Sequence, residues 1–323
     1  MAQTHTPPVI EFDGLAPDEA FAALGNETRV AIIRALWEAN AHRVYDDIDA
    51  TDHTISFSEL RRAVNIRDNG QFNYHLSKLV PHFVRQTEAG YRLSEPGRKV
   101  ARAVVANAGG DALGLTESLE GGCPFCGGAL QAGYEDHWLR VKCTACPGEF
   151  GDSAPDGTLF HAPLARQAIE DQSSDEALSR GIYRCMLDLP YLMQGMCREC
   201  ASTIDASLSI CETHNTDDGP CAECNTMHPV WGELRCDTCR FAKRLPIDVC
   251  VLGLTPVIAF LYDREIDVFA AALDGLSALE TQLQTEVSVE SGVTVSISDG
   301  TESLEVTIDD SMGVREAIRD NIR

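Results

Sequence analysis

The sequence predicts an α+β fold divided among several domains, and three observations lead to this expectation. Apolar residues recur at helical spacing through the first third of the 323-residue chain, where a short hairpin pattern follows them. Cysteines in C-x2-C pairs occupy the middle of the chain, and alternating apolar and polar residues near its end predict antiparallel strands. With 44% hydrophobic residues, a chain of this length can bury a core in each of two or three domains.

The segment 55–93 has the order of helix, turn, helix and hairpin that defines a winged helix-turn-helix. Ser56 is a good N-cap for the first helix, and the letters IRDNG supply the break before the second. In the second helix Phe72, Leu76 and Leu79 recur at i, i+4 and i+7, so we expect them to share one buried face.

The side chains that this pattern leaves exposed suit contacts with double-stranded DNA. Amides, a phenol and a lysine on the outer face of the second helix can read base edges in a major groove. The hairpin, or wing, is predicted from strands 84–87 and 91–93, and its arginines can reach phosphates. The candidate DNA contacts are Arg67, Asn69, Gln71, Asn73, Tyr74, Ser77, Lys78, Arg85 and Arg92. A winged domain that contacts only proteins is the alternative.

The charge distribution favours a polyanion site in this segment. Residues 55–106 hold nine basic and four acidic side chains, a balance of +5, in a chain whose formal net charge is -24. A basic island in an acidic chain is the expected footprint of nucleic-acid binding. Only four of the 26 basic residues are lysines, and acid-rich, lysine-poor surfaces are typical of cytoplasmic proteins that work in molar salt. We therefore interpret the acidity as a sign of habitat.

Helices are predicted on both sides of this segment. Two support helices cover 17–24 and 27–40, the second with Val30, Ile33 and Trp37 on one face, and a third helix covers 95–107. The Pro-rich residues 1–16 are expected to form a mobile arm. Glycines near residue 110 predict a domain boundary there, so the DNA-binding domain is expected to span residues 17–110. The sequence shows no signal peptide and no run of about 20 apolar residues, so we expect a cytoplasmic protein outside the membrane.

A first zinc ribbon is predicted at residues 119–152. Cys123 and Cys126 form one C-x2-C pair, and Cys143 and Cys146 form another after sixteen intervening residues. Each tight turn presents two sulfurs, so four thiolates can surround one zinc ion. In a reducing compartment, paired cysteines indicate metal rather than disulfides.

A second metal-binding region is expected within 160–245, after helices at 162–170 and 174–189. Its four ligand pairs call for two more zinc ions, three in all. The pairs are Cys197 with Cys200, Cys211 with His214, Cys221 with Cys224, and Cys236 with Cys239. In the simplest arrangement the first and second pairs share one ion, and the third and fourth pairs share the other. The spacing also leaves an interleaved arrangement open, in which the first pair shares an ion with the fourth and the second with the third. We interpret His228 as a surface residue, and Cys185 and Cys250 as core residues.

The remaining residues, 246–323, predict a small α/β region. An apolar helix is expected at 247–262, followed by three antiparallel strands at 285–290, 293–298 and 304–308 and by a short final helix or tail at 312–323. The sequence contains no phosphate loop, nucleophile elbow or HExxH motif, and closed thiolate sites leave no position for a substrate. We therefore expect no enzymatic activity.

Several motifs resemble those of known families. LGNETRVAIIRALWE (Leu24 to Glu38), His75-Leu76 and Gly90-Tyr91-Arg92-Leu93 resemble the ArsR-like winged-helix regulators of archaea. The CPFCGG motif looks like the opening of the zinc-rich carboxy-terminal region attached to such regulators in halophilic archaea. The resemblance implies a homodimer whose interface is made by the first helix and the helix after the wing. A winged helix followed by a zinc ribbon also resembles the basal archaeal factor related to the alpha subunit of eukaryotic TFIIE.

Together these features predict a sequence-specific transcriptional regulator that binds DNA as a dimer. Its zinc-stabilised carboxy-terminal region would bind an effector or a partner. The alternative is a basal-factor-like protein that contacts RNA polymerase or other proteins through its winged helix and zinc ribbons.

Overall fold

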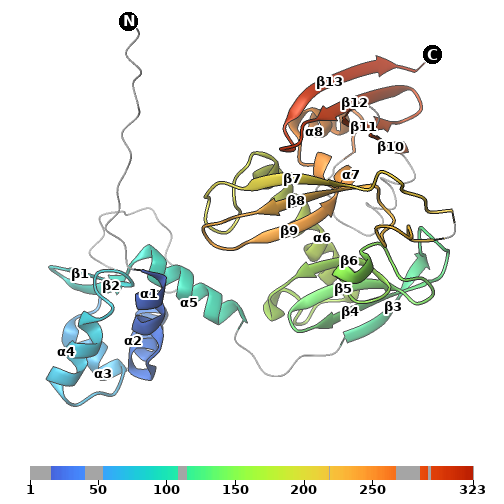
Figure 1. The fold of residues 1–323 in the computed structure, drawn as a ribbon. Coiled ribbons are helices and arrows are strands. Elements are labelled where there is room, and N and C mark those ends of the chain that lie inside the picture. Colours follow the sequence, from blue (N-terminus) through green and yellow to red (C-terminus); the bar gives the residue numbers. More distant parts are fainter. Residues whose placement is uncertain are drawn as a thin grey trace, which may run out of the picture. The chain divides into compact units, whose positions relative to one another are not determined.

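The computed structural model describes residues 16–40, 54–107, 115–217, 219–266, 284–289 and 292–322 of the chain (Figure 1). The chain is mixed α+β, as predicted, and its sheets are small and antiparallel. It divides into two compact units, Met1–Ala108 and Gly109–Arg323. Apart from Ala16, the predicted N-terminal arm lies outside the described residues.

The first unit contains five helices and one hairpin among its described residues, and all lie where the sequence predicts them. These elements are α1 (Pro17–Leu24), α2 (Glu27–Asn40), α3 (Phe57–Ala63), α4 (Asn69–Ser77), β1 (Val84–Thr87), β2 (Gly90–Leu93) and α5 (Glu95–Asn107). Ser56 caps α3 by accepting a hydrogen bond from the Glu59 backbone N–H, and the Glu59 carboxylate accepts one from the Ser56 N–H. Asp68 caps α4 through the Gln71 N–H.

The core of the first unit is built from the faces that α2 and α4 turn inward. Phe72, Leu76 and Leu79 are buried, which confirms their predicted face. The prediction for Val30 is wrong, because its side chain is 47% exposed. Ile33 is buried as predicted, but the fully buried positions of α2 are Ile32 and Leu36, so the inward face only partly overlaps the predicted one.

The second unit begins with a four-stranded antiparallel sheet in sequence order. Its strands are β3 (Leu115–Gly122), β4 (Ala129–Glu135), β5 (Trp138–Cys143) and β6 (Thr158–Pro163). The helix predicted at 162–170 is wrong, because β6 occupies its start by pairing with β5 and only a 3-10 turn (Arg166–Ala168) follows. The predicted helix at 174–189 is present as α6 (Ser174–Met193), which packs Leu178 and Ile182 into the core that contains Leu139 and Val141 of β5.

A three-stranded sheet and two helices follow. The strands are β7 (Asp205–Ile210), β8 (Val230–Arg235) and β9 (Ala242–Pro246), with β8 in the centre. The single helix predicted at 247–262 is instead two helices, α7 (Ile247–Val251) and α8 (Thr255–Tyr262). Pro256 lies in the first turn of α8, where its missing N–H costs nothing, so it starts a helix here.

The last sheet confirms the three predicted strands and adds a fourth. Its strands are β10 (Gln284–Ser288), β11 (Val293–Ser298), β12 (Glu302–Ile308) and β13 (Val314–Asn321), paired in sequence order. The final helix predicted at 312–323 is wrong, because the chain turns back and pairs with β12. Asp309 forms this turn by accepting hydrogen bonds from the backbone N–H groups of Ser311 and Gly313.

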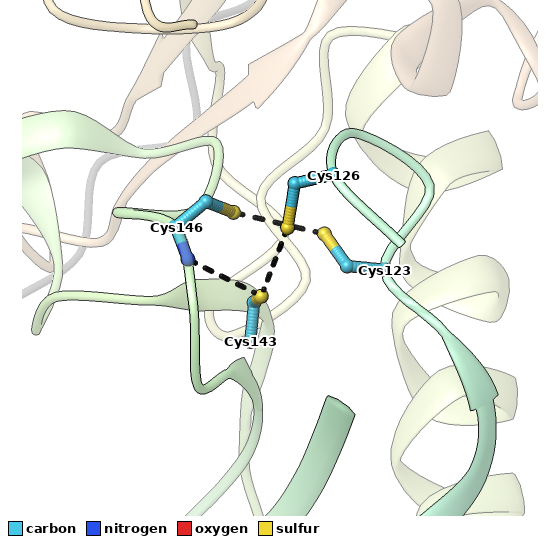
Figure 2. A group of neighbouring side chains, drawn as sticks. All are labelled: Cys123, Cys126, Cys143 and Cys146. Atoms are coloured by element: carbon cyan, nitrogen blue, oxygen red, sulfur yellow. Dashed lines mark hydrogen bonds between the residues drawn. The ribbon is translucent and has the colours of Figure 1, made fainter. Parts of the chain in front are cut away.

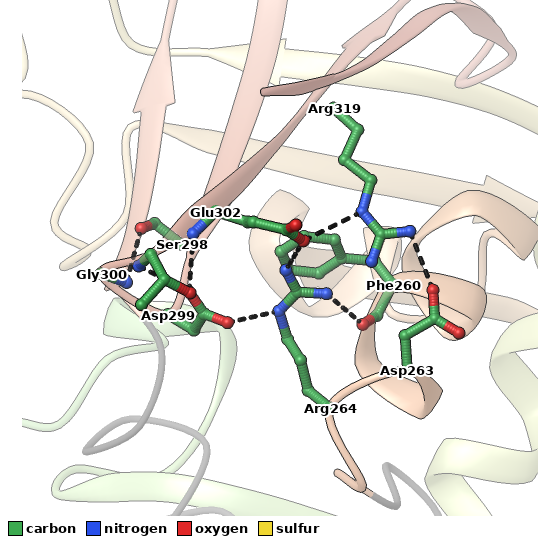
Figure 3. Close-up of polar contacts among 9 residues, drawn as sticks. Phe260, Asp263, Arg264, Ser298, Asp299, Gly300, Glu302 and Arg319 are labelled. Atoms are coloured by element: carbon green, nitrogen blue, oxygen red, sulfur yellow. Dashed lines mark hydrogen bonds and ion pairs between the residues drawn. The ribbon is translucent and has the colours of Figure 1, made fainter. Parts of the chain in front are cut away.

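Two arginines fasten this sheet to α8 (Figure 3). The Arg264 guanidinium lies 3.4 Å from the centre of the Phe260 ring, donates to Asp299 at 2.6 Å, and forms an ion pair with Glu302. Arg319 of β13 lies 2.8 Å from Asp263 and 3.3 Å from Glu302. Asp299 also accepts backbone hydrogen bonds from Thr301 and Glu302, so it closes the β11–β12 turn.

No helix in the described part of the chain is both long and apolar enough to cross a membrane.

Candidate metal centres

The twelve predicted metal ligands come together in three groups of four. Within each group the potential ligand atoms all lie within 4.8 Å of one another. Centre 1 is Cys123, Cys126, Cys143 and Cys146; centre 2 is Cys197, Cys200, Cys236 and Cys239; centre 3 is Cys211, His214, Cys221 and Cys224. Each centre could therefore hold one metal ion.

Centre 1 has the dimensions of a tetrahedral thiolate site (Figure 2). The Sγ atoms of Cys123 and Cys146 are 3.7 Å apart, and those of Cys126 and Cys143 are 3.5 Å apart. Metal–sulfur bonds of about 2.3 Å give a tetrahedron with sulfur–sulfur edges of about 3.8 Å. A disulfide would need about 2.05 Å, so neither pair is a disulfide and both distances suit four thiolates around one ion.

The backbone at centre 1 is shaped to hold the sulfurs. The Cys146 N–H donates to the Cys143 sulfur at 3.4 Å, and the Gly128 N–H donates to the Cys126 sulfur at 3.4 Å. A side chain at Gly128 would meet the Cβ of Ala145 at 2.7 Å. Glycine is therefore required where the two cysteine turns approach each other.

Centres 2 and 3 have the interleaved pairing rather than the simplest, sequential one. β7 and β8 are antiparallel, with Asp205 opposite Arg235 and Ile210 opposite Val230. Antiparallel pairing brings the segment before β7 to the segment after β8, which joins the first cysteine pair with the fourth. At the other end of the hairpin, the segment after β7 meets the segment before β8, which joins the second pair with the third.

The histidine of centre 3 is oriented by a backbone carbonyl. Its Nδ1 atom lies 3.4 Å from the Cys224 sulfur, and its Nε2 atom lies 3.3 Å from the Met227 carbonyl oxygen. The carbonyl can only accept, so Nε2 carries the proton and Nδ1 is free to bind a metal. His214 thus has the arrangement expected of a ligand.

Backbone N–H groups favour the thiolate form at one cysteine of each centre. Backbone hydrogen bonds from Asn215, Cys224 and Glu223 lower the pKa of Cys221 to about 6. The pKa of Cys236 is lowered to about 7, mainly by a hydrogen bond from the backbone N–H of Cys239. At Cys143 burial raises the pKa, but N–H groups of Ala145 and Cys146 outweigh it and bring the pKa to about 7. The thiolate is the form that binds metal. Burial raises the pKa of the neighbouring thiols Cys146 and Cys211, to about 12 and about 11, so the thiolate form is favoured at one cysteine of each centre and not at all of its cysteines.

His228 is not the surface residue that the sequence predicted. Its Nε2 atom lies 3.2 Å from Glu149 and its Nδ1 atom 3.7 Å from Asp248, and its side chain is only 19% exposed. Burial lowers the pKa of His228, but the two carboxylates outweigh burial and raise it. No local pattern indicates this contact, because Glu149 and Asp248 are distant in the chain.

The two remaining cysteines are buried away from the three centres, as predicted. Cys250 is fully buried, and burial raises the pKa of its thiol. Cys185 lies on the buried face of α6. Both are core residues.

The candidate DNA contacts lie in the first unit, and eight of the nine are exposed. Those on or beside α4 are Arg67, Asn69, Gln71, Asn73, Tyr74, Ser77 and Lys78. Arg85 is also exposed, whereas Arg92, opposite it in the hairpin, is half-buried and its Nε atom is enclosed. Sequence reasoning missed Arg61, which donates to the Ile66 and Arg67 carbonyls and so holds the turn between α3 and α4.

Comparison with known proteins identifies two domains in the chain. Residues 17–104 match the family described as Domain of unknown function (DUF7347), and residues 120–314 match Domain of unknown function (DUF7351). No curated protein and no solved structure matches. Because the second match covers more than half of the 323 residues, the chain belongs to the DUF7351 family.

Proposed function

We propose that this protein is a sequence-specific, DNA-binding transcriptional regulator whose Met1–Ala108 unit is a winged helix-turn-helix. The observation that carries the proposal is the division of α4 into two faces. Phe72 and Leu76 fix the inner face of α4 in the core. On the outer face, Gln71, Asn73 and Tyr74 are exposed to solvent, and the exposed fraction of Tyr74 is 56%. Amides and a phenol on a firmly anchored helix are suited to base edges.

The surroundings of α4 support this role. Arg61 fastens the turn before α4, and the Lys78 ammonium lies 5.8 Å from the Tyr74 ring centre. Arg85 extends from β1 into solvent, where it can reach a phosphate of the DNA backbone. The half-buried Arg92 is the weaker of the two predicted phosphate contacts.

Dimerisation would use apolar side chains that α1 and α5 leave exposed. Phe21 of α1 is 74% exposed and Val104 of α5 is 58% exposed, and both helices pack against α2. If the resemblance to ArsR-like regulators holds for assembly, these two helices would form the dimer interface. A dimer would present two copies of α4 to an inverted repeat in DNA.

Zinc is the metal that best fits the three centres. Four cysteines, or three cysteines with one histidine, in tetrahedral geometry are typical of structural zinc, and such closed ligand sets leave no coordination position for a substrate. We propose that three zinc ions stabilise the Gly109–Arg323 unit, which would bind an effector or a partner. Metal analysis of protein purified without chelator should find three zinc ions per chain, and fewer than two would contradict this assignment.

The DNA proposal is tested by separating base contacts from phosphate contacts. Gln71→Ala with Tyr74→Ala should reduce discrimination between a specific and a random duplex, by about 1–3 kcal/mol for each base contact. Arg85→Ala should weaken binding to both duplexes about equally. It should also reduce the slope of the logarithm of affinity against the logarithm of salt concentration by about 1. Intact discrimination in the first variant would show that α4 does not read bases.

A further inference from the structure

We propose that the Gly109–Arg323 unit carries a second nucleic-acid site, which binds a single strand through phosphates and an unpaired base. The site, here called the His161 patch, consists of Trp138, Arg140, Lys142, His161 and Lys243. It is independent of α4 and of the proposed duplex recognition by the first unit.

Strand register places most of the patch on one face of the first sheet. Trp138, Arg140 and Lys142 alternate along β5 with the buried Leu139 and Val141, so they share the opposite face. Arg140 is directly opposite His161 of β6. The Trp138 ring lies 5.3 Å from the His161 ring, and the Phe150 ring stacks on His161 at 4.8 Å.

The two lysines of the patch are not neutralised by a carboxylate in the part of the protein that the structure describes. The side chains of Lys142 and Lys243 have no ion pair or hydrogen bond within the described part of the chain. The carboxylate nearest to Arg140 is that of Glu135, which is 4.0 Å away and 74% exposed. Burial lowers the pKa of His161, and the nearby charges of Lys243 and Arg140 lower it further.

This concentration of charge stands out in its unit. Residues 109–323 hold fourteen basic and thirty-six acidic side chains, and the whole chain has only four lysines. Two of those four lysines are in the patch. Two unpaired lysines on one face of a strongly acidic unit are suited to an anionic ligand from outside the chain.

The residue types of the patch indicate the chemical class of its anionic ligand. Lysine and arginine side chains at successive positions of a strand can follow the phosphates of a polynucleotide backbone. Trp138 is 37% exposed and offers an indole on which an unpaired base can stack, a contact that a duplex or a free phosphate cannot make. A single strand is therefore the ligand that uses both the charge and the ring.

The test uses the full, metal-loaded chain and a fluorescent thymidine oligonucleotide of about 15 nucleotides, long enough to cover one such site. Lys142→Gln with Lys243→Gln should weaken binding at least tenfold and reduce the salt slope by about 1.4, as expected for two phosphate contacts on a single strand. The control, Arg235→Gln with Arg240→Gln, makes the same charge change at exposed positions of the same unit and should have little effect. Equal loss in both variants would overturn the site.

The stacking contact needs a separate measurement. Trp138→Ala should weaken binding of the oligonucleotide about 5- to 150-fold, the usual effect of losing one stacked base, while inhibition by inorganic tripolyphosphate should not change. No effect of Trp138→Ala on the oligonucleotide would overturn strand binding. Gln71→Ala with Tyr74→Ala should leave oligonucleotide binding intact, so failure of this proposal and failure of the duplex proposal are distinguishable.

Discussion

The Sγ atoms of Cys197 and Cys239 lie 3.6 Å apart although 42 positions separate the two residues in the chain. The β7–β8 hairpin causes this approach, because its antiparallel strands bring their outer ends together. Centres 2 and 3 therefore lie at opposite ends of strands of six residues, a length of about 20 Å. Loss of either metal should loosen one end of the hairpin first.

The pairing can be tested with cadmium in place of zinc. Cadmium NMR should show two sites with four sulfurs and one with three sulfurs and a nitrogen. In the structure's pairing, Cys200→Ser perturbs a four-sulfur signal and Cys221→Ser perturbs the signal with nitrogen. Sequential pairing gives the reverse assignment, so an exchange of the two results would contradict the structure.

Arg264 should contribute strongly to the stability of the last sheet. Its side chain is 10% exposed and pairs with both Asp299 and Glu302, so Arg264→Met removes one cationic partner from each of two carboxylates. We expect a loss of at least about 2 kcal/mol in the free energy of unfolding, measured by denaturant titration. Arg319→Met is the matched control, because it contacts Glu302 but is 43% exposed. An equal loss in the control would show that burial of Arg264 is not the cause.

His228 should make stability depend on pH. Its pKa in the folded protein is raised above 6.5 by Glu149 and Asp248, so protonated His228 stabilises the fold below about pH 6.5. This contribution is lost as the pH rises through the raised pKa. The stability difference between the wild type and His228→Gln, with metal saturated, should therefore be largest below about pH 6.5 and shrink as the pH rises through the raised pKa. A difference that stays constant or grows would contradict the ion pair.

Dimer formation should depend on the exposed apolar residues of α1 and α5. Phe21→Ser with Val104→Ser removes apolar area from both helices and should convert the dimer to a monomer in sedimentation experiments. Tyr262→Ser is the control, since Tyr262 is 80% exposed but lies in the other unit. A dimer that survives the double substitution would place the interface elsewhere.

Local patterns were sufficient where neighbours in sequence determine the structure. The N-cap at Ser56, the spacing of Phe72 and Leu76, and the C-x2-C turns all act over a few residues, so the helices and hairpin of the first unit and the paired cysteines were predictable. The end of the chain was not, because Val314–Asn321 forms a strand only through pairing with β12. Without that partner strand, the same residues have no strong preference for a β-strand.

Long-range contacts account for the other differences. His228 looks like a surface residue until Glu149 and Asp248 are brought to it from distant elements. The ligand pairing of centres 2 and 3 depends on which strands are adjacent, a property that spacing does not encode. The His161 patch was likewise invisible in the sequence, because β5, β6 and β9 contribute to it separately.

In the proposed function, α4 of the first unit reads specific DNA sequences. The most direct measurement is genome-wide occupancy of the tagged protein in cells grown at molar salt, where the acidic surface is screened. We expect peaks at a limited set of promoters that share an inverted repeat, and their loss in the Gln71→Ala and Tyr74→Ala variant. Occupancy at most active promoters, or no enrichment at all, would contradict sequence-specific regulation.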